Sequence, residues 1–214
     1  MVSIRWLGHS CFRIRNEEGT SLIIDPHDGH SLGLKPPDEK GEIILITHDH
    51  FDHNQYRNVE REGSQIMRDA GGYSHGGYEI RGFDAFHDDS GGKKRGNIVI
   101  FSICTDGMKM SHLGDLGHQP GAALRDALAD TDILFLPIGG YYTIDAQGAW
   151  SVIDALKPRV VVPMHYGIGG LSLRLDPLDR FLSVRDTEKT SVGNEVDLLR
   201  EDLPEKTEVW IFSL

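Results

Sequence analysis

Short apolar runs separated by turn residues dominate the chain, and this pattern predicts many β-strands and few helices. The first runs alternate apolar and polar positions or end at a Gly- or Pro-containing turn, which is typical of a β-meander over residues 3–25. The next run, Ile43 to Ile46, is continuous and predicts a buried strand. Further strands are expected at residues 78–86, 97–104, 108–113, 132–138, 159–164 and 208–212.

Helical spacing is rarer and lies mainly in the second half of the chain. Pro120 opens a stretch with apolar residues at helical spacing that predicts a helix to about Asp130. Helices are also expected at residues 53–62, 146–156 and 176–183. Hairpins early and strand–helix alternation later predict a two-layer sheet core with helices outside. The length of 214 residues and the absence of repeats or linkers favour one compact domain over residues 1–214.

Composition narrows the classes of partner. With 22 Lys and Arg against 33 Asp and Glu, the net charge is -11, so we expect neither nucleic acid nor an anionic membrane as a partner. The basic run Lys93-Lys94-Arg95 is expected to be a solvated hairpin tip. The N-terminus lacks the features of a signal peptide and no apolar run approaches membrane-spanning length, so the cytoplasm is the expected location.

The two cysteines, Cys11 and Cys104, are far apart and have no CxxC spacing. This arrangement indicates neither a disulfide framework nor a cysteine-type zinc site. We expect two reduced thiols in the core.

The segment after the run Ile43 to Ile46 carries the strongest chemical signal. His48, His50, Asp52 and His53 place four metal-ligand side chains within six residues. At a strand end, residues two apart point to the same side, so His48 and His50 can face one point. Asp52 is expected to cap the helix predicted to follow. Imidazole and carboxylate are the usual ligands of zinc and similar ions, so one metal or two neighbouring metals would fit here.

Other candidate ligands also stand where an apolar strand stops and a polar or Gly-rich loop begins. They are His87, Asp115 and His165. His75 is an alternative to His87, but it sits within a glycine-rich stretch, whereas His87 follows a strand-like run. Together with the first segment the set holds five histidines and two aspartates, which suits two divalent ions bridged by one carboxylate.

The remaining polar candidates have weaker signals. His9 and Asp25 stand at strand ends and would orient ligands or make ordinary hairpin hydrogen bonds. His112 is expected to pack in its strand, while His118 would reach a substrate or donate a proton. Two residues after the Gly139-Gly140 turn would line a pocket, although helix capping is the simpler role for the second: Tyr142 and Asp145. His27 and His30 are expected to lie on the surface of the loop at 26–42.

The local sequences around these residues resemble the metallo-β-lactamase superfamily. The order H-x-H-x-D-H, an isolated His, an Asp after a strand and a late His is similar to its metal-binding pattern. One branch resembles the chain more closely, that of the small metal-dependent hydrolases grouped with L-ascorbate-6-phosphate lactonase and N-acyl-phosphatidylethanolamine phospholipase D. The segments that carry this resemblance are Trp6-Leu7-Gly8-His9-Ser10, Leu22-Ile23-Ile24-Asp25-Pro26, His112-Leu113-Gly114-Asp115-Leu116-Gly117-His118, Ile138-Gly139-Gly140 with Tyr142-Thr143-Ile144-Asp145, and Pro163-Met164-His165-Tyr166-Gly167.

The resemblance implies an α+β fold, a four-layer αββα sandwich with the metal site at one edge. It implies that His48, His50 and His87 hold one metal. It implies that Asp52, His53 and His165 hold a second metal, and that Asp115 bridges both. Zinc is the first expectation for the two divalent ions, and manganese, nickel or iron would also suit the ligands.

The implied reaction is hydrolysis of an ester-type bond, a phosphodiester or a lactone first, by hydroxide bound between the metals. Asp52, Asp115 and His118 are the expected catalytic residues. The expected substrate is a small molecule, phosphorylated ones included, and exposed sheet edges would allow a homo-oligomer.

Two other functions are weighed beside hydrolysis. A metal-dependent oxidoreductase is disfavoured because His50 stands where di-iron relatives typically place a carboxylate. A non-catalytic metal-binding protein is disfavoured because the ligand set is complete.

Overall fold

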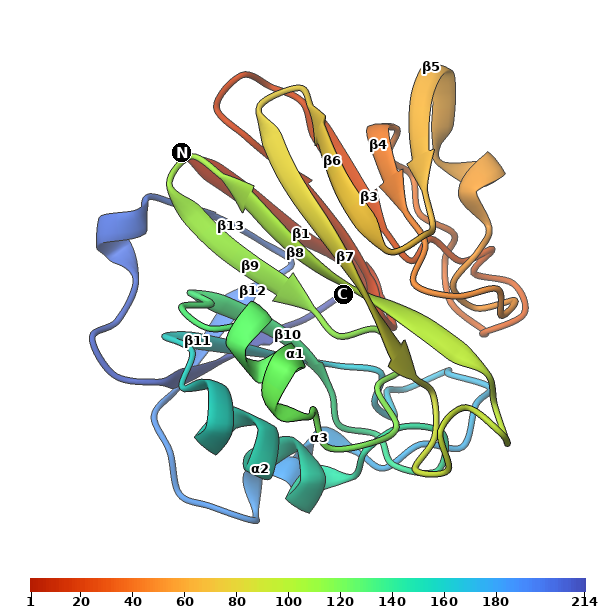
Figure 1. Ribbon diagram of the computed structural model, residues 1–214. Coiled ribbons are helices and arrows are strands. Elements are labelled where there is room, and N and C mark those ends of the chain that lie inside the picture. Colours follow the sequence, from red (N-terminus) through yellow and green to blue (C-terminus); the bar gives the residue numbers. More distant parts are fainter.

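The computed structural model describes residues 1–214, and two mixed β-sheets packed face to face form its centre (Figure 1). The six-stranded sheet has the order β13-β1-β2-β3-β4-β5 and the eight-stranded sheet the order β12-β14-β11-β10-β9-β8-β7-β6. The strands are β1 Val2–Gly8, β2 Cys11–Arg15, β3 Ser21–Ile24, β4 Gly41–Leu45, β5 Glu60–Met67, β6 Gly71–His75, β7 Tyr78–Phe86, β8 Asn97–Thr105, β9 Met108–His112, β10 Ile133–Pro137, β11 Val160–Met164, β12 Lys189–Gly193, β13 Glu195–Leu198 and β14 Glu208–Phe212.

The helices gather beside the parallel half of the eight-stranded sheet (Figure 1). They are α1 Ala122–Ala127, α2 Ala146–Leu156 and α3 Leu178–Leu182, with short 3₁₀ turns η1 Tyr56–Asn58 and η2 Arg200–Asp202. Over the six-stranded sheet, η1 packs Tyr56 against a small apolar cluster, and no α-helix lies there. The expected sheet core with outer helices is confirmed, but the fourth, helical layer of an αββα sandwich is reduced to this 3₁₀ turn and loops.

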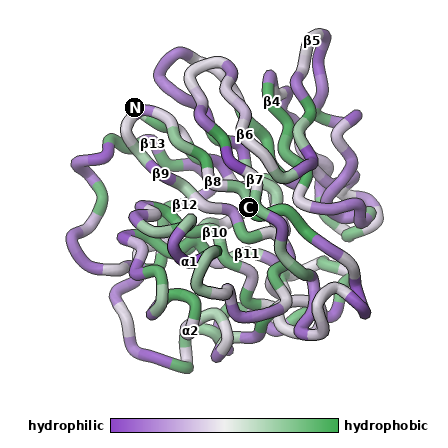
Figure 2. Tube along the Cα trace, viewed as in Figure 1, coloured by the Kyte–Doolittle hydropathy of each residue, from purple (hydrophilic) through white to green (hydrophobic).

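The core lies between the sheets and continues under α2. Phe12 of β2 and Phe135 of β10 have ring centroids 4.6 Å apart, so they join the two sheets directly. The strands β10 and β11 are buried along their whole length because they pair on both sides and are covered on both faces, and Figure 2 shows them as largely hydrophobic. On α2, Trp150 stacks on Phe181 of α3 at 4.9 Å. This packing gives the strand ends a rigid base.

The helix expected at residues 53–62 is wrong. The chain instead makes a turn, η1 and the strand β5, in which Ile66 pairs with Ile44 of β4 in parallel register. Asp52 therefore caps no helix. Three further strands, β6, β12 and β13, were not predicted from the apolar pattern, and the helices at residues 146–156 and 176–183 are confirmed as α2 and α3.

The cysteine prediction holds for one thiol only. Both cysteines are free, but Cys11 is buried whereas Cys104 is exposed on β8. Cys104 pairs in register with Lys109 of β9, and its side chain is on the solvent side of the alternation. None of the helices has the length and apolar character needed to cross a membrane.

Candidate metal centre

The predicted ligands meet at one edge of the sandwich because strands from both sheets end there. His9 follows β1, and the segment with His48 to His53 follows β4 of the same sheet. From the other sheet, His87 follows β7, Asp115 follows β9 and His165 follows β11. Loops at strand ends on a rigid sheet core commonly carry functional groups.

These side chains form two neighbouring ligand sets. The inner set is His9, Asp52, His53 and His165, and all four are buried. The outer set is His48, His50 and His87, of which His50 is exposed. Within each set the potential ligand atoms all lie within 4.8 Å of one another.

The carboxylate of Asp115 lies between the two sets. Its Oδ2 is 3.1 Å from His165 Nε2 and 3.3 Å from His87 Nε2. Its Oδ1 is 3.3 Å from Nε2 of His53. Asp115 thus faces ligands of both sets at once, which is the arrangement that a bridging carboxylate requires.

The donor atoms fit metal ions. Tetrahedral coordination with bonds of about 2.1 Å places ligand atoms about 3.4 Å apart, and the contacts of Asp115 with the four surrounding imidazoles run from 3.1 to 3.8 Å. His48 Nε2, His53 Nε2 and Asp115 Oδ1 are buried without a hydrogen-bond partner. Buried polar atoms are rarely left unpaired, so these orphans indicate a missing ligand such as a cation.

Burial and charge keep most of the set in the form that binds metals. Burial lowers the pKa of His9 and of His48 to about 3, so both imidazoles are neutral donors near pH 7. Burial would raise the pKa of Asp115, but His165 and His53 hold it well below its usual value. His53 is the exception: burial opposes its charge, yet Asp115, Asp52 and Asp25 raise its pKa. Without a cation, this carboxylate-rich pocket attracts a proton to His53 instead.

A buried carboxylate fixes the ring of His53 from behind. Asp25 Oδ2 lies 2.9 Å from His53 Nδ1 and accepts from the Thr47 hydroxyl at 2.8 Å. The Thr47 backbone N–H donates to Asp25 Oδ1 at 2.8 Å. An acceptor on Nδ1 selects the tautomer that leaves Nε2 free for a metal. The expectation that Asp25 orients a ligand agrees with this geometry.

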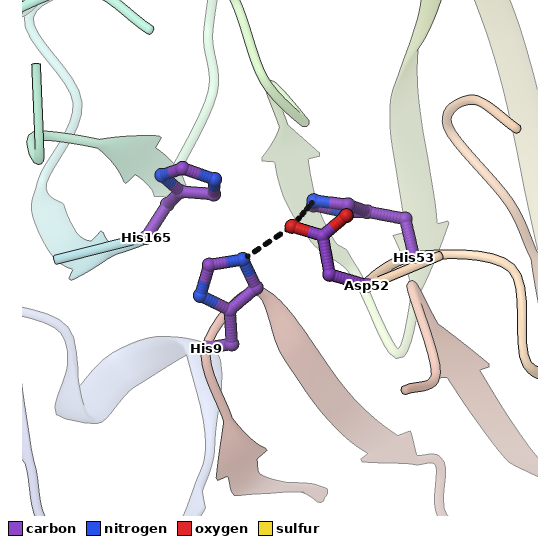
Figure 3. A group of neighbouring side chains, drawn as sticks. All are labelled: His9, Asp52, His53 and His165. Carbon is purple, nitrogen blue, oxygen red and sulfur yellow. Dashed lines mark hydrogen bonds and ion pairs between the residues drawn. The ribbon is translucent and has the colours of Figure 1, made fainter. Parts of the chain in front are cut away.

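His9 holds Asp52 in the same way (Figure 3). Its Nε2 is 3.1 Å from Asp52 Oδ2, the oxygen that also lies 3.4 Å from His53 Nε2. The His9 and His165 rings have centroids 4.2 Å apart and are tilted by 45° to each other, and His9 Nδ1 is buried without a partner. His9 and His165 both have left-handed backbone, with φ of 55° and 51°. Such strained conformations are kept where surrounding structure demands them, here to turn both rings inward at strand ends.

Two motif glycines let the ligand loops approach. A Cβ on Gly117 would lie 2.3 Å from the His87 carbonyl carbon, and a Cβ on Gly139 would lie 2.1 Å from the His165 carbonyl oxygen. No side chain fits at either distance. The glycines after Asp115 and after β10 are therefore needed for the close packing of the ligand strands.

A cleft of about 270 Å³ opens onto the centre. It is lined by His50, Phe51, Asp52, His87, Arg95, Asp115, Tyr142, His165 and Leu173. No serine, cysteine, threonine or lysine is among them. The interpretation of Tyr142 as a pocket residue agrees with this lining, whereas Asp145 caps α2 by accepting from the Gly148 N–H at 2.9 Å.

Several candidate histidines lie away from the ligand sets. His118 accepts from the Phe86 N–H at 3.2 Å through Nε2, and its Nδ1 lies 2.9 Å from the Gln119 carbonyl oxygen. Both ring nitrogens are thus engaged with backbone, and His118 is not among the residues that line the cleft, so this geometry does not favour its expected role as a proton donor. His112 packs in the core as expected, with Nε2 3.0 Å from the Ser10 carbonyl oxygen. His75 is exposed on the edge strand β6, far from either ligand set.

The two histidines of the loop at residues 26–42 differ in their exposure. His30 is exposed as expected, but His27 is fully buried. Its Nε2 lies 3.1 Å from the Leu7 carbonyl oxygen, and its Nδ1 accepts from the Gly29 N–H. These contacts hold the loop at residues 26–42 against β1. The surface prediction for His27 is wrong because it treated a long polar loop as solvated.

Sequence reasoning missed three residues that line the cleft, Phe51, Leu173 and the basic residue Arg95. Arg95 was assigned to a solvated tip, yet it lines the cleft beside Tyr142. Its position in the loop that directly follows His87 was the available signal.

Comparison with known proteins agrees with this geometry. Residues 3–165 match the model of the beta-lactamase superfamily domain. A UPF0173 metal-dependent hydrolase of Thermoplasma acidophilum is 32% identical over 215 residues, covering 89% of this chain and 94% of that protein. The structure of a candidate Zn-dependent hydrolase of the metallo-β-lactamase superfamily from Thermotoga maritima is 30% identical, with a TM-score of 0.80 over the whole of both chains.

A more distant structural neighbour shows the fold alone. The diiron β-hydroxylase CmlA of Streptomyces venezuelae is 16% identical with a TM-score of 0.59, covering 83% of this chain and 48% of that one. Fold, family match and sequence identity agree on the family of this chain. The chain belongs to the metallo-β-lactamase superfamily and, within it, to the family of UPF0173 metal-dependent hydrolases.

Proposed function

We propose that this protein is a metal-dependent hydrolase that binds two divalent ions and cleaves an ester-type bond in a small molecule. The observation that carries the proposal is the position of Asp115 between two ligand sets, with orphaned donor atoms on both sides. In the proposed assignment His48, His50 and His87 hold one ion, and Asp52, His53 and His165 hold the other. Its similarity to proteins named metal-dependent hydrolases supports the activity.

When bound, two divalent ions would lower the pKa of a shared water and polarise a carbonyl or phosphoryl oxygen. The other contributions to the reaction, such as proton transfer, would come from the side chains of the protein. Asp52 Oδ2 is held by His9 and faces the ligand atom of His53, where it would contact the inner ion, so Oδ1 is the oxygen left to accept a proton from a water in the cleft. Burial would raise the pKa of Asp52, but His53 and the hydrogen bond with His9 hold it well below its usual value and keep Asp52 ionised.

The lining of the cleft supports hydrolysis by water. It offers no hydroxyl of serine or threonine and no thiol as a nucleophile, so a covalent intermediate with such a group has no donor. The volume of about 270 Å³ fits a small molecule better than a polymer. Phosphodiesters and lactones both match this size and chemistry.

Metal analysis and turnover test the proposal together. Purified protein should contain two equivalents of zinc, manganese or nickel and should hydrolyse bis-(p-nitrophenyl) phosphate or a simple lactone, with activity lost in chelator and restored by metal. One redox-active iron site with no hydrolysis would overturn it and favour the oxidoreductase. Full metal content with no turnover of either substrate class would favour a non-catalytic metal-binding protein.

A further inference from the structure

We propose that Arg95 forms an anion-binding subsite at the mouth of the cleft, and that the substrate carries a phosphate or carboxylate group remote from the bond that is cleaved. The inference rests on the proposed hydrolysis for the identity of the reaction, but the subsite itself can be tested by binding alone. It assigns a role to a basic residue that the ligand sets leave unexplained.

The loop that carries Arg95 is held in one shape by a buried carboxylate. Asp88, next to His87, accepts backbone N–H groups from Ser90 at 2.8 Å and Gly92 at 3.0 Å through one oxygen. Its other oxygen accepts from Lys94 at 2.9 Å and from Arg95 at 2.8 Å. Four donors on one carboxylate hold the backbone of this loop in place, while the side chains of Lys93, Lys94 and Arg95 are exposed, as expected for a solvated tip.

The three basic residues of the loop point to different places. Lys94 Nζ is 2.8 Å from Asp89 Oδ1, on the exposed side. Lys93 is exposed and has no side-chain partner. Only Arg95 turns to the cleft: its Nη2 donates to the Tyr141 carbonyl oxygen at 3.0 Å, and its guanidinium lies 4.9 Å above the Tyr142 ring. The hydrogen bond and the stacking fix the plane of the guanidinium.

Arg95 is left without a counter-charge. The chain has 33 acidic side chains, yet none lies within 4.0 Å of this guanidinium, and its Nε and Nη1 have no protein acceptor. It is the only lysine or arginine among the cleft-lining residues. A guanidinium held in plane with free N–H groups matches the oxygens of phosphate and carboxylate, which accept two parallel hydrogen bonds. Its partner is therefore expected to enter with the substrate.

Three aryl esters test the subsite on zinc-loaded protein. They share the same acyl chain and differ only in the group at its far end, which is a hydroxyl, a carboxylate or a phosphate. Arg95→Gln should raise KM at least about 10-fold for the anionic ester that is preferred, leave kcat within about 2-fold, and leave the hydroxyl ester unchanged. Lys93→Gln is the matched control, since it removes one charge from the same loop, and should behave as the wild type. The carboxylate and phosphate arms identify which anion the subsite prefers.

A binding measurement separates the subsite from the reaction. In titration calorimetry on the zinc-loaded protein, n-butyl phosphate or butyrate should bind at least about 10-fold more tightly to the wild type than to Arg95→Gln. If neither these esters nor bis-(p-nitrophenyl) phosphate nor a simple lactone is hydrolysed but this difference remains, the proposed reaction is wrong and the subsite stands. Equal effects of Arg95→Gln and Lys93→Gln, or an equal loss for all three esters, would overturn the subsite.

Discussion

The two ligand sets differ in how firmly the protein holds them. The inner set is buried throughout, and it is backed by Asp25 on His53 and by His9 on Asp52. The outer set has one exposed member, His50, and its one backed ring is His48, whose Nδ1 lies 2.9 Å from the Thr47 hydroxyl. Nδ1 has no partner in His87 of the outer set or in His165 of the inner set. Rigid backing raises metal affinity, while exposure gives access. We infer that the inner set retains its ion longer and that the outer set is where ions exchange and substrate enters.

Removing the shared carboxylate should have the largest effect. Asp115→Ala takes a ligand from both sets and leaves its surrounding imidazoles without a counter-charge, so both ions should be lost and activity should fall far beyond the 10–100-fold typical of backing residues. Mass spectrometry of metal content after dialysis measures the loss. A variant that kept two ions and full turnover would contradict the bridging assignment.

Loss of an outer ligand should remove one ion only. His50→Ala alters an exposed side chain, so the thermal midpoint of metal-free protein should stay within a few degrees of the wild type. Metal content should drop from two equivalents to one, with activity reduced about 100-fold or more. If both ions left together, the two sets would not be separable and the comparison would fail.

The backing of the inner set is tested by Asp25→Asn. The amide retains one acceptor but can no longer fix the His53 tautomer and satisfy Thr47 together, so affinity for one ion should fall about 10–100-fold. Competition with a chromophoric chelator measures this affinity. The outer ion should be affected less, since Asp25 reaches His48 of the outer set only through the Thr47 hydroxyl, and Lys93→Gln serves as an unrelated surface control.

His9→Gln should weaken the inner set less than Asp25→Asn, by about 10-fold, because the assigned ligands Asp52, His53 and His165 remain and His53 keeps its Asp25 partner. The glutamine side chain can still donate a hydrogen bond but cannot reproduce the ring packing against His165. Chelator competition resolves the two ions, and His9→Ala should cost more than His9→Gln. Equal loss of both ions in His9→Gln would show that His9 does not belong to one set.

The smallest expected effect is on pH dependence. His9 and His48 have pKa values lowered to about 3 by burial, so between about pH 6.5 and 3 the unfolded chain binds more protons than the folded one. The free energy of unfolding of metal-free protein should therefore fall as pH falls below 6.5, although the raised pKa of His53 opposes this in part.

Urea unfolding in chelator at pH 7.5, 6.5 and 5.5 measures the slope. His9→Gln should make it shallower by up to about 1.4 kcal/mol per pH unit, since one buried neutral histidine is removed. An unchanged slope in His9→Gln would mean that His9 is not held neutral by the fold.

The sequence predicted the central strands and most of the residues that the fold brings together in the candidate metal centre. β10 and β11 are apolar throughout because both faces are covered, so their pattern needs no tertiary information. The candidate ligands His87, Asp115 and His165 follow such strands directly or within three residues, and the strand ends place them at one edge. Ligand chemistry and strand pattern were therefore enough to group them before any distance was known.

Which residues form the edge strands of the two sheets was decided only by the tertiary structure. The four strands that the apolar pattern did not predict are the four outermost ones: β5 and β13 in one sheet, β6 and β12 in the other. An edge strand pairs on one side and buries little, so it carries no strong hydrophobic signal. In β5, the sequence EREGSQIM even resembles a polar helix, and pairing with β4 decides its conformation.

The same limit applies to individual side chains. His9 and Arg95 join the site because segments distant in sequence bring Asp52 to one and Tyr142 to the other. His27 and His118 look equally available in sequence, but backbone groups from other segments occupy their ring nitrogens.

The chain by itself determined which residues could bind metals, because that depends on side-chain chemistry and strand ends. Only the fold decided which polar groups already have hydrogen-bond partners. Those partners come from segments distant in sequence, which a local sequence pattern does not show.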